Sequence, residues 1–224
     1  MMRKTFLLSK KAIIINIITQ VKNLFFRKNN LLVAYMKAYR HNNHIVIGRS
    51  SNLFNCKINI VGGENYVTIG EKCNLKGLSI YMNDNNNTVQ IGNRVNVNSD
   101  SLRLTRFNAC GGSQIIIGDN CLFSNSIELH TTDYHPIYAL NDVKQIPIGP
   151  RTNIPSPIVI GEHTWIGLRT IVLRGVVIKP NTIIGACSVV VKSNQESYEV
   201  IAGNPAKVIK RGTIWSVSNH ISQY

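Results

Sequence analysis

Histidines carry the side chains in this sequence that are best suited to acid–base chemistry near neutral pH. His130 and His135 are five residues apart, and His163 lies further along the chain. An imidazole with a pKa near about 6.5 can accept a proton at neutral pH. Neutral imidazoles also suit zinc. The histidines alone therefore leave two chemistries open, general-base catalysis and metal binding.

His135 stands near the start of a stretch that cannot continue as regular strand. Five of the seven prolines fall between Leu129 and Ile158, namely Pro136, Pro147, Pro150, Pro155 and Pro157. Proline cannot donate to a strand ladder, so this stretch must leave the sheet as a loop. Ordered loops of such length are usually functional. We predict an extruded loop over residues 131–157 with His135 at its root.

The segments that must position this loop repeat every six residues. Aliphatic residues stand at 160, 166, 172, 178, 184 and 190. A small or β-branched residue follows four positions after each of the first five, at 164, 170, 176, 182 and 188. Period six matches neither a helix nor an alternating strand. It is typical of a three-sided solenoid whose aliphatic side chains point inwards. We expect glycine and asparagine to serve its turns, because they tolerate positive φ.

The same signature appears earlier in the chain at wider spacing. Isoleucine–glycine pairs begin at residues 47, 69, 91 and 117, which are 22, 22 and 26 residues apart. Three hexapeptides would take 18 residues, so each of these coils carries an insertion, for example at 83–87. The repeat predicts an all-β solenoid over residues 44–203, followed by a tail over 204–224.

The five cysteines favour packing over chemistry. They are odd in number, widely spaced and without a CxxC pair, which argues against a disulfide framework and fits a reducing cytoplasm. Cys73 and Cys121 fall at small inward positions of the repeat, where we expect them to fill the core. The others are Cys56, Cys110 and Cys187.

The positive charge is concentrated at the N-terminus. The net charge is +14, and residues 1–40 hold nine of the 25 lysines and arginines with no acidic residue. We expect residues 1–43 to form a short helical segment, with one or two basic amphipathic helices over 5–40. Three roles stay open: a cap over one end of the solenoid, contact with the inner face of a membrane, or binding of a polyanionic polymer. The apolar run at 12–18 is too short to span a membrane.

Three motifs together resemble the bacterial hexapeptide-repeat acyltransferases, which fold as a left-handed parallel β-helix. They are IGEHTWIG at 160–167, TTDYHPIY at 131–138 and VIAGNPAKVIK at 200–210. The resemblance spans about residues 45–212. Within that family the chain looks most like O-acetyltransferases of bacterial surface polysaccharides, including sialic-acid capsules, on the evidence of HPIY, the H-x-W before IG, and Trp215.

The resemblance implies an acetyl-CoA-dependent sugar O-acetyltransferase that forms a homotrimer, with active sites between neighbouring prisms. It implies His135 as the general base and Trp165 beside the acetyl group and the acceptor, although Trp165 could instead be an interface aromatic. The expected partners are a carbohydrate, polymeric or anionic, and copies of the chain itself. We expect no metal and no nucleic acid.

The same resemblance implies a donor site and leaves the acceptor site open. The residues implied for CoA are Gly167, Leu168, Ala186, Lys192, Pro205 and Lys210, with small residues letting pantetheine lie close and the lysines meeting phosphates. Leu168 departs from the small residue usual there, so only its backbone is expected to contribute. Candidates for binding the acceptor or orienting His135 are Arg103, Arg106, Asp133 and Glu128, although each could be an ordinary solvated side chain.

Other functions remain open at this point. The related β-helix carbonic anhydrases hold zinc with three histidines at a subunit interface, two of them five residues apart, as His130 and His135 are. A non-catalytic scaffold is a further alternative, against which the loop with His135 argues. Within the enzymes, N-acetylation of an amino sugar or O-acetylation of a small acceptor also fits.

Overall fold

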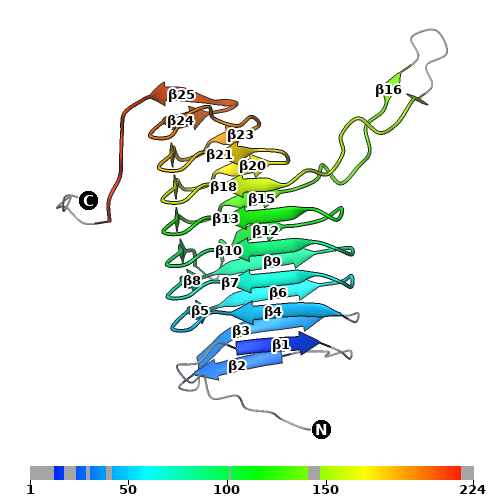
Figure 1. Ribbon diagram of the computed structural model, residues 1–224, viewed down its shortest axis with the longest axis vertical. Coiled ribbons are helices and arrows are strands. Elements are labelled where there is room, and N and C mark those ends of the chain that lie inside the picture. The colour runs from blue at the N-terminus through cyan, green and yellow to red at the C-terminus, as the bar shows by residue number, and fades with distance from the viewer. Residues whose placement is uncertain are drawn as a thin grey trace.

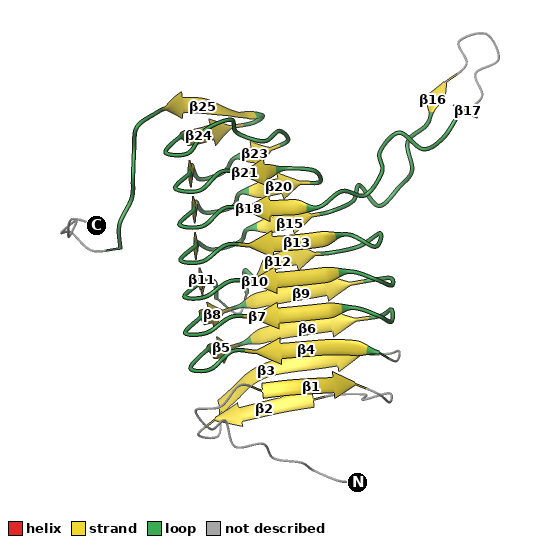
Figure 2. Cartoon of the chain, viewed as in Figure 1, coloured by secondary structure: helices red, strands yellow, loops and turns green. Residues whose placement is uncertain are grey.

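The structure, a computed structural model, is a three-sided β-solenoid from which a single long loop projects (Figure 1). It describes residues 13–17, 24–28, 31–38, 42–100, 102–140 and 147–217; for the first three segments and 147–148 only the backbone is described. These residues contain strands, turns and loops but no helix (Figure 2). Accordingly, none of the described residues belongs to a helix that could cross a membrane.

Three sheets form the sides of the prism, and we name them A, B and C. Sheet A contains β1 (Ile13–Ile17), β4 (Asn43–Ile47), β7 (Tyr66–Ile69), β10 (Thr88–Ile91), β13 (Gln114–Ile117), β18 (Ile158–Ile160) and β21 (Val177–Ile178). Sheet B contains β2 (Leu24–Lys28), β3 (Leu31–Ala38), β6 (Cys56–Ile60), β9 (Leu78–Met82), β12 (Thr105–Asn108), β15 (Glu128–His130), β20 (Ile171–Leu173) and β23 (Val189–Val190). Sheet C contains β5 (Asn52–Phe54), β8 (Asn74–Lys76), β11 (Asn96–Asn98), β14 (Leu122–Phe123), β19 (Trp165–Ile166), β22 (Ile183–Ile184), β24 (Val200–Gly203) and β25 (Ala206–Lys210).

Each coil runs through A, then C, then B, and its strands pair in parallel with those of the next coil. The three turns of a coil are therefore an A–C corner, a C–B corner and a B–A corner. The aliphatic residues of the repeat point into the prism, and Ile160, Ile166 and Val172 are each at most 1% exposed. The small positions Thr164, Thr170 and Cys121 are fully buried beside them. The predicted all-β parallel solenoid is confirmed.

The glycines after the aliphatic residues have a different role from the one predicted. A Cβ on Gly70 would lie 2.5 Å from the carbonyl oxygen of Gly92 in the next coil, and one on Gly118 would lie 2.5 Å from the amide nitrogen of Glu162. These glycines make room for the stacked backbone, and their φ angles are not positive. Positive φ falls two residues later instead, for example at Lys72 and His163.

A buried asparagine ladder ties the B–A corners together. Asn43, Asn65 and Asn87 are 22 residues apart and fully buried. The side-chain oxygen of each accepts a hydrogen bond from the backbone of the coil above, at Asn65, Asn87 and Ser113 respectively, over 2.8–3.0 Å. These coil-to-coil hydrogen bonds offset much of the cost of burying the amides, and among the described residues only the side-chain nitrogen of Asn65 in this ladder has no hydrogen-bond partner. The ladder fixes the register of successive coils.

The helices predicted for residues 5–40 are wrong wherever the structure describes that segment. Strand β1 pairs antiparallel with β4, β3 pairs in parallel with β6, and β2 pairs antiparallel with β3. The open end of a solenoid presents unpaired backbone groups, and only added strands can satisfy them directly. The β-branched and aromatic content of Ile13–Ile15 and Phe25–Phe26 suits that role. The remaining residues of the predicted helices lie outside the described ranges.

The predicted loop over 131–157 leaves the solenoid at the B–A corner between β15 and β18 (Figures 1 and 2). Its described part carries a short antiparallel pair, β16 (Ala139–Leu140) and β17 (Pro147–Ile148). The loop extends well beyond the prism, as predicted from its prolines. The residues at its base are consequently the ones that the solenoid can hold in place.

Replacing Gly70 by alanine should destabilise the protein by about 1–3 kcal/mol, because the new methyl group overpacks the next coil. Denaturant unfolding at equilibrium measures this cost. Thr68→Ala, on the exposed face of β7, which ends one residue before Gly70, is the matched control and should change the free energy of unfolding by under about 0.5 kcal/mol. Equal stability of the two variants would contradict the close-approach role.

Candidate active site

The extruded loop is pinned to the solenoid at both of its stems. Thr131 is fully buried, and its hydroxyl donates to the carbonyl oxygen of Cys110 and accepts from the Cys110 amide, each over 2.9 Å. The amide of Ser156, on the returning stem, donates to the carbonyl oxygen of Thr131 over 3.0 Å. The coils on either side therefore hold the loop where it begins and ends.

His135 lies four residues beyond this pin, with its ring exposed. Its amide donates to the carbonyl oxygen of Asp133 over 2.7 Å, around Tyr134 at a φ of 62°. The amide of Tyr134 donates to the hydroxyl of Thr132 over 3.1 Å. The imidazole of His135 has no hydrogen-bond partner within the described part of the chain. The backbone of this histidine is fixed while its ring stays available.

Asn153 is the centre of the loop base. It is 2% exposed, and its side-chain nitrogen donates to the carbonyl oxygen of His135 over 2.7 Å and to Oδ2 of Asp133 over 3.0 Å. Its side-chain oxygen accepts from the amide of Ile137 over 2.6 Å and from Nε of Arg151 over 2.9 Å. One buried amide thus joins the outgoing stem to the returning stem.

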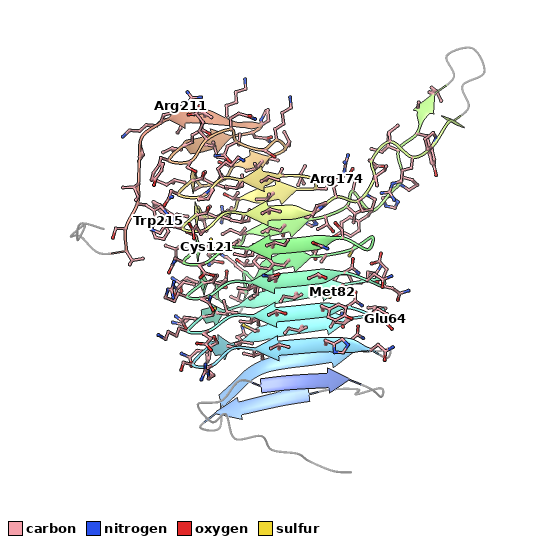
Figure 3. The ribbon with its side chains drawn as sticks, in the orientation of Figure 1. Glu64, Met82, Cys121, Arg174, Arg211 and Trp215 are labelled. Carbon is pink, nitrogen blue, oxygen red and sulfur yellow. The ribbon has the colours of Figure 1, made fainter. Side chains whose placement is uncertain are left out.

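Asp133 is held by an arginine from the next coil. Nε of Arg174, which follows β20, donates to Oδ2 of Asp133 over 2.7 Å (Figure 3). Burial raises the pKa of Asp133, but the hydrogen bonds from Arg174 and Asn153 and the charges of Arg174 and Arg151 outweigh it, so the pKa lies below its usual range. The carboxylate contacts these groups and not the His135 ring, contrary to one role considered for it.

Glu128 contacts His130 and not His135, the histidine that it was considered to orient. Its Oε2 lies 3.0 Å from Nε2 of His130, and its Oε1 accepts from Nη1 of Arg106 over 2.7 Å. Nδ1 of His130 lies 3.1 Å from the hydroxyl of Tyr134. Burial raises the pKa of Glu128, but its contacts with His130 and Arg106 outweigh this and lower it. Glu128 and Arg106 therefore support the Tyr134 side of the loop and not His135 directly.

Arg103 does not join this cluster. It lies in an exposed bend between β11 and β12, at a C–B corner, and its amide donates to Oδ1 of Asp100 over 2.6 Å. Arg106 points outward from β12, and Glu128 already neutralises it. The structure therefore separates the two arginines that the sequence grouped together.

Trp165 lies on the outer face of sheet C and is 37% exposed. Its indole nitrogen donates to the hydroxyl of Ser124 over 3.4 Å. The C-terminal tail brings Trp215 beside it, with ring centroids 6.2 Å apart. Trp215 in turn stacks on His163 at 4.5 Å and donates to the carbonyl oxygen of that residue over 2.8 Å. The tail thus builds an aromatic group on this side of the prism.

A single chain does not bring His135 and Trp165 together. His135 extends from a B–A corner, whereas Trp165 belongs to sheet C, the side opposite that corner. Figure 3 shows Arg174 beside the base of the loop and Trp215 on the other side of the solenoid. Any reaction that uses both residues requires a second copy of the chain.

Four of the residues implied for CoA share one edge. Gly167, Leu168 and Ala186 follow sheet C strands at C–B corners of successive coils, and Pro205 follows β24 in the turn that joins it to β25 of the same sheet. The backbone at this edge is already used in stacking: the carbonyl oxygen of Leu168 accepts from Cys187 over 2.7 Å. A Cβ on Gly167 would lie 2.6 Å from the amide nitrogen of Ala186, so stacking itself requires this glycine.

The two lysines of that set lie elsewhere. Lys192 lies two residues after β23, the last strand of sheet B. Lys210 is the last residue of β25, where it pairs with Val200, the first residue of β24. Both are exposed. The exposed side chains of the shared edge are those of Leu168, Ala186 and Pro205.

The described residues contain no group of three or more histidines, cysteines or carboxylates placed to hold a metal ion. Both ring nitrogens of His130 already face partners, Glu128 and Tyr134. His163 occupies a positive-φ turn position at an A–C corner, far along the coil from His130, and its Nδ1 lies 2.8 Å from Oδ1 of Asn181. Each of these two histidines therefore has a structural role within its own chain.

The sequence analysis missed Asn153 and Arg174. Arg174 precedes Gly175 at a corner of the regular repeat, where nothing in the hexapeptide pattern distinguishes it from a solvated side chain. Asn153 lies in the proline-rich stretch, which has no period at all. The roles of both residues depend on contacts that form only when the loop packs against the B–A corner of the next coil.

Comparison with known proteins gives relatives for nearly half of the chain. No family model matches. Over 102 residues, 46% of the chain, it is 29% identical to a polysialic acid O-acetyltransferase of Escherichia coli O1:K1 / APEC and 32% identical to one of Neisseria meningitidis. The chain spans only 31% and 45% of the length of these two relatives.

The fold comparison extends over most of the molecule. The crystal structure of the polysialic acid O-acetyltransferase OatWY superposes with a TM-score of 0.69 at 26% identity, covering 82% of this chain and 81% of that one. The resemblance inferred from the motifs is confirmed: the chain is similar in sequence and in fold to hexapeptide-repeat acetyltransferases.

The four buried cysteines should not react in the folded protein. Burial raises the pKa of Cys56 to about 11 and that of Cys121 to about 12, and it also raises the pKa of Cys73 and Cys110. At pH 8 no more than about one in a thousand of the Cys56 and Cys121 thiols is ionised. We expect a thiol reagent to titrate one group rapidly in the native state, the exposed Cys187, and five after denaturation. A second fast thiol would contradict the packing role.

Proposed function

We propose that this protein is an acetyl-CoA-dependent O-acetyltransferase that modifies a sugar hydroxyl of a bacterial surface polysaccharide. The observation that carries this proposal is His135: hydrogen bonds at the loop base hold its backbone, and its exposed imidazole has no hydrogen-bond partner among the residues that the structure describes. Its motif, TTDYHPIY at 131–138, is one of the three on which the resemblance to the hexapeptide-repeat acyltransferases rests.

His135 acts as the general base in the proposed reaction. A ring nitrogen of the neutral imidazole accepts the hydroxyl proton while the hydroxyl oxygen attacks the thioester carbonyl carbon. The carbon–sulfur bond then breaks, the acetyl group stays on the sugar oxygen, and the proton passes from the imidazolium to the CoA sulfur. No cysteine is placed as a nucleophile, because four are buried and Cys187 lies at a coil corner. Direct transfer is therefore preferred over an acyl-enzyme.

We propose a homotrimer in which each active site combines two copies. The loop of one prism would bring His135 to the sheet C side of its neighbour, where Trp165 lies close to the edge formed by Leu168, Ala186 and Pro205. The wide separation of His135 and Trp165 within one chain supports this arrangement. Ala186 leaves room for the pantetheine arm of the donor, and Lys192 and Lys210 are proposed to meet its phosphates as point charges.

The proposed acceptor is an anionic glycan, with a sialic-acid polymer as the leading candidate. Arg151 lies at the loop base, and it has no carboxylate partner among the described residues. Near His135, two guanidinium groups, of Arg151 and Arg174, therefore lie close to one carboxylate, that of Asp133, which pairs with Arg174. The excess positive charge favours an acceptor that carries carboxylates. Residues 1–40, with nine positive charges, are proposed to hold such a polymer or an anionic membrane surface.

A screen of acetyl-CoA turnover, corrected for hydrolysis, tests the acceptor class. Sialic-acid polymers, other anionic glycans, neutral glycans and amino sugars should be compared at equal residue concentration. Selective O-acetylation of the anionic glycans would support the proposal, and transfer to an amine would redirect it to N-acetylation.

We propose that the enzyme acts in the cytoplasm, where acetyl-CoA is made, at the inner face of the membrane.

His135→Ala should lower turnover by about two to four orders of magnitude, the contribution of a positioned general base, while acetyl-CoA affinity changes little. Steady-state kinetics and donor titration measure both effects. Trp165→Ala should lower turnover less than His135→Ala does. Retention of most activity by His135→Ala would make the base assignment wrong.

Mixing two inactive variants should restore activity if each site combines two chains. His135→Ala lacks the base, and Ala186→Trp blocks the donor edge, so each homotrimer should be inactive. Random co-assembly after refolding should regain about a quarter of the wild-type rate, because one site in four then combines both intact parts. Sedimentation must first show that both variants form trimers. An active wild-type monomer, or no recovery in verified mixed trimers, would argue for a site within one chain.

A further inference from the structure

The side chain of Asn153 makes four hydrogen bonds at the base of the loop and is almost completely buried. Two of them bind the backbone on either side of Pro136: the carbonyl oxygen of His135 at 2.7 Å and the amide of Ile137 at 2.6 Å. The other two bind side chains, Asp133 at 3.0 Å and Arg151 at 2.9 Å. The two amide donors and the amide oxygen are all used.

These contacts form a continuous path from the solenoid to His135. Arg174 follows a strand of sheet B and binds Asp133, and its Nη1 also reaches the carbonyl oxygen of Ile154 over 3.4 Å. Asp133 binds Asn153, and Asn153 binds the backbone of His135. On the other side, the amide of His135 is tied to the carbonyl oxygen of Asp133. The exposed ring itself makes no hydrogen bond within the described part of the chain.

We propose that Asn153, anchored through Asp133 by Arg174, is a positioning residue that sets where the ring of His135 points. This inference rests on the proposed acetyl transfer. Asn153 touches neither sugar nor donor in this scheme and acts only through the His135 backbone. Because a displacement of about 1 Å at a reacting group can cost about a hundredfold in rate, a loosened loop base should be visible in catalysis.

The sharpest variant is Asn153→Asp, which keeps the shape and both acceptor contacts but places carboxylate oxygens against Asp133 and the His135 carbonyl. We expect kcat to fall by about 10- to 100-fold, with KM for donor and acceptor within about twofold, because only the placement of the base changes. Arg174→Gln should lower kcat more weakly and leave KM for the donor unchanged, whereas KM for an anionic acceptor should rise because a positive charge is lost. Arg174→Lys keeps the charge and should keep most of kcat. Arg49→Gln, which removes an exposed ion pair with Glu71 at 3.0 Å, is the matched control and should leave kcat unchanged.

An exchange of the two partners gives a rescue test. In Asp133→Asn combined with Asn153→Asp, an amide again faces a carboxylate, so the contact between positions 133 and 153 is restored. The contact to the His135 carbonyl is not restored. The double variant should therefore recover several-fold of the kcat lost in Asn153→Asp without reaching the wild type. A merely destabilising Asn153→Asp substitution would lose rate in proportion to its unfolded fraction, and that result would overturn the proposal.

Amide hydrogen exchange tests the positioning without any turnover. Ile137 is 55% exposed, yet its amide should be protected in the wild type, because it donates to buried Asn153. In Arg174→Gln the Asn153 side chain is still present, so protection at Ile137 should fall several-fold only if the anchor holds the loop base in place. Unchanged protection would overturn the proposed path. A wild type that exchanges as expected but transfers no acetyl group would instead refute the proposed function alone.

Discussion

The close contact between successive coils at the prism corners is the constraint on which the rest of this structure depends. Coils that pair their strands in parallel bring corner backbones so close that a single Cβ at Gly70 or Gly118 would collide with the next coil. That contact imposes the glycine column, and with it the 22-residue register seen again in the ladder of Asn43, Asn65 and Asn87. The aliphatic core follows from the same register, because each inward side chain stacks on its equivalent one coil away.

A fixed register also determines where irregular chain can go. Between β15 and β18 the coil must close on itself although 27 residues lie between His130 and Ile158. The excess leaves as a loop whose stems are clamped at Thr131 and Ser156, and the side chains next to the clamp inherit the rigidity of the solenoid. His135 lies within this stiffened zone, four residues beyond Thr131.

The periodic part of the molecule could be predicted from the sequence, and the aperiodic part only in outline. A six-residue period is unambiguous over many repeats, so the solenoid, the buried Cys121 and the position of the loop were predicted correctly. The N-terminal strands were not, because a basic apolar segment without a period fits a helix as well as a strand, and the open sheet edge decided between them. The partners of Glu128 and Asp133 were missed for another reason. These contacts join neighbouring coils, and they depend on the direction in which side chains near the corners point. The residue types within one coil do not determine that direction.

The B–A corner has a consequence for engineering. In four successive coils this corner carries the extra residues, at 61–65, 83–87, 109–113 and 131–157, while the strands before and after them stay in register. The free-energy cost of lengthening a surface loop grows slowly, by about 0.6 kcal/mol per doubling. This one edge of the prism is therefore a row of grafting points at a regular spacing. Peptides inserted there would be displayed as a linear array, at intervals set by the strand separation of about 4.8 Å.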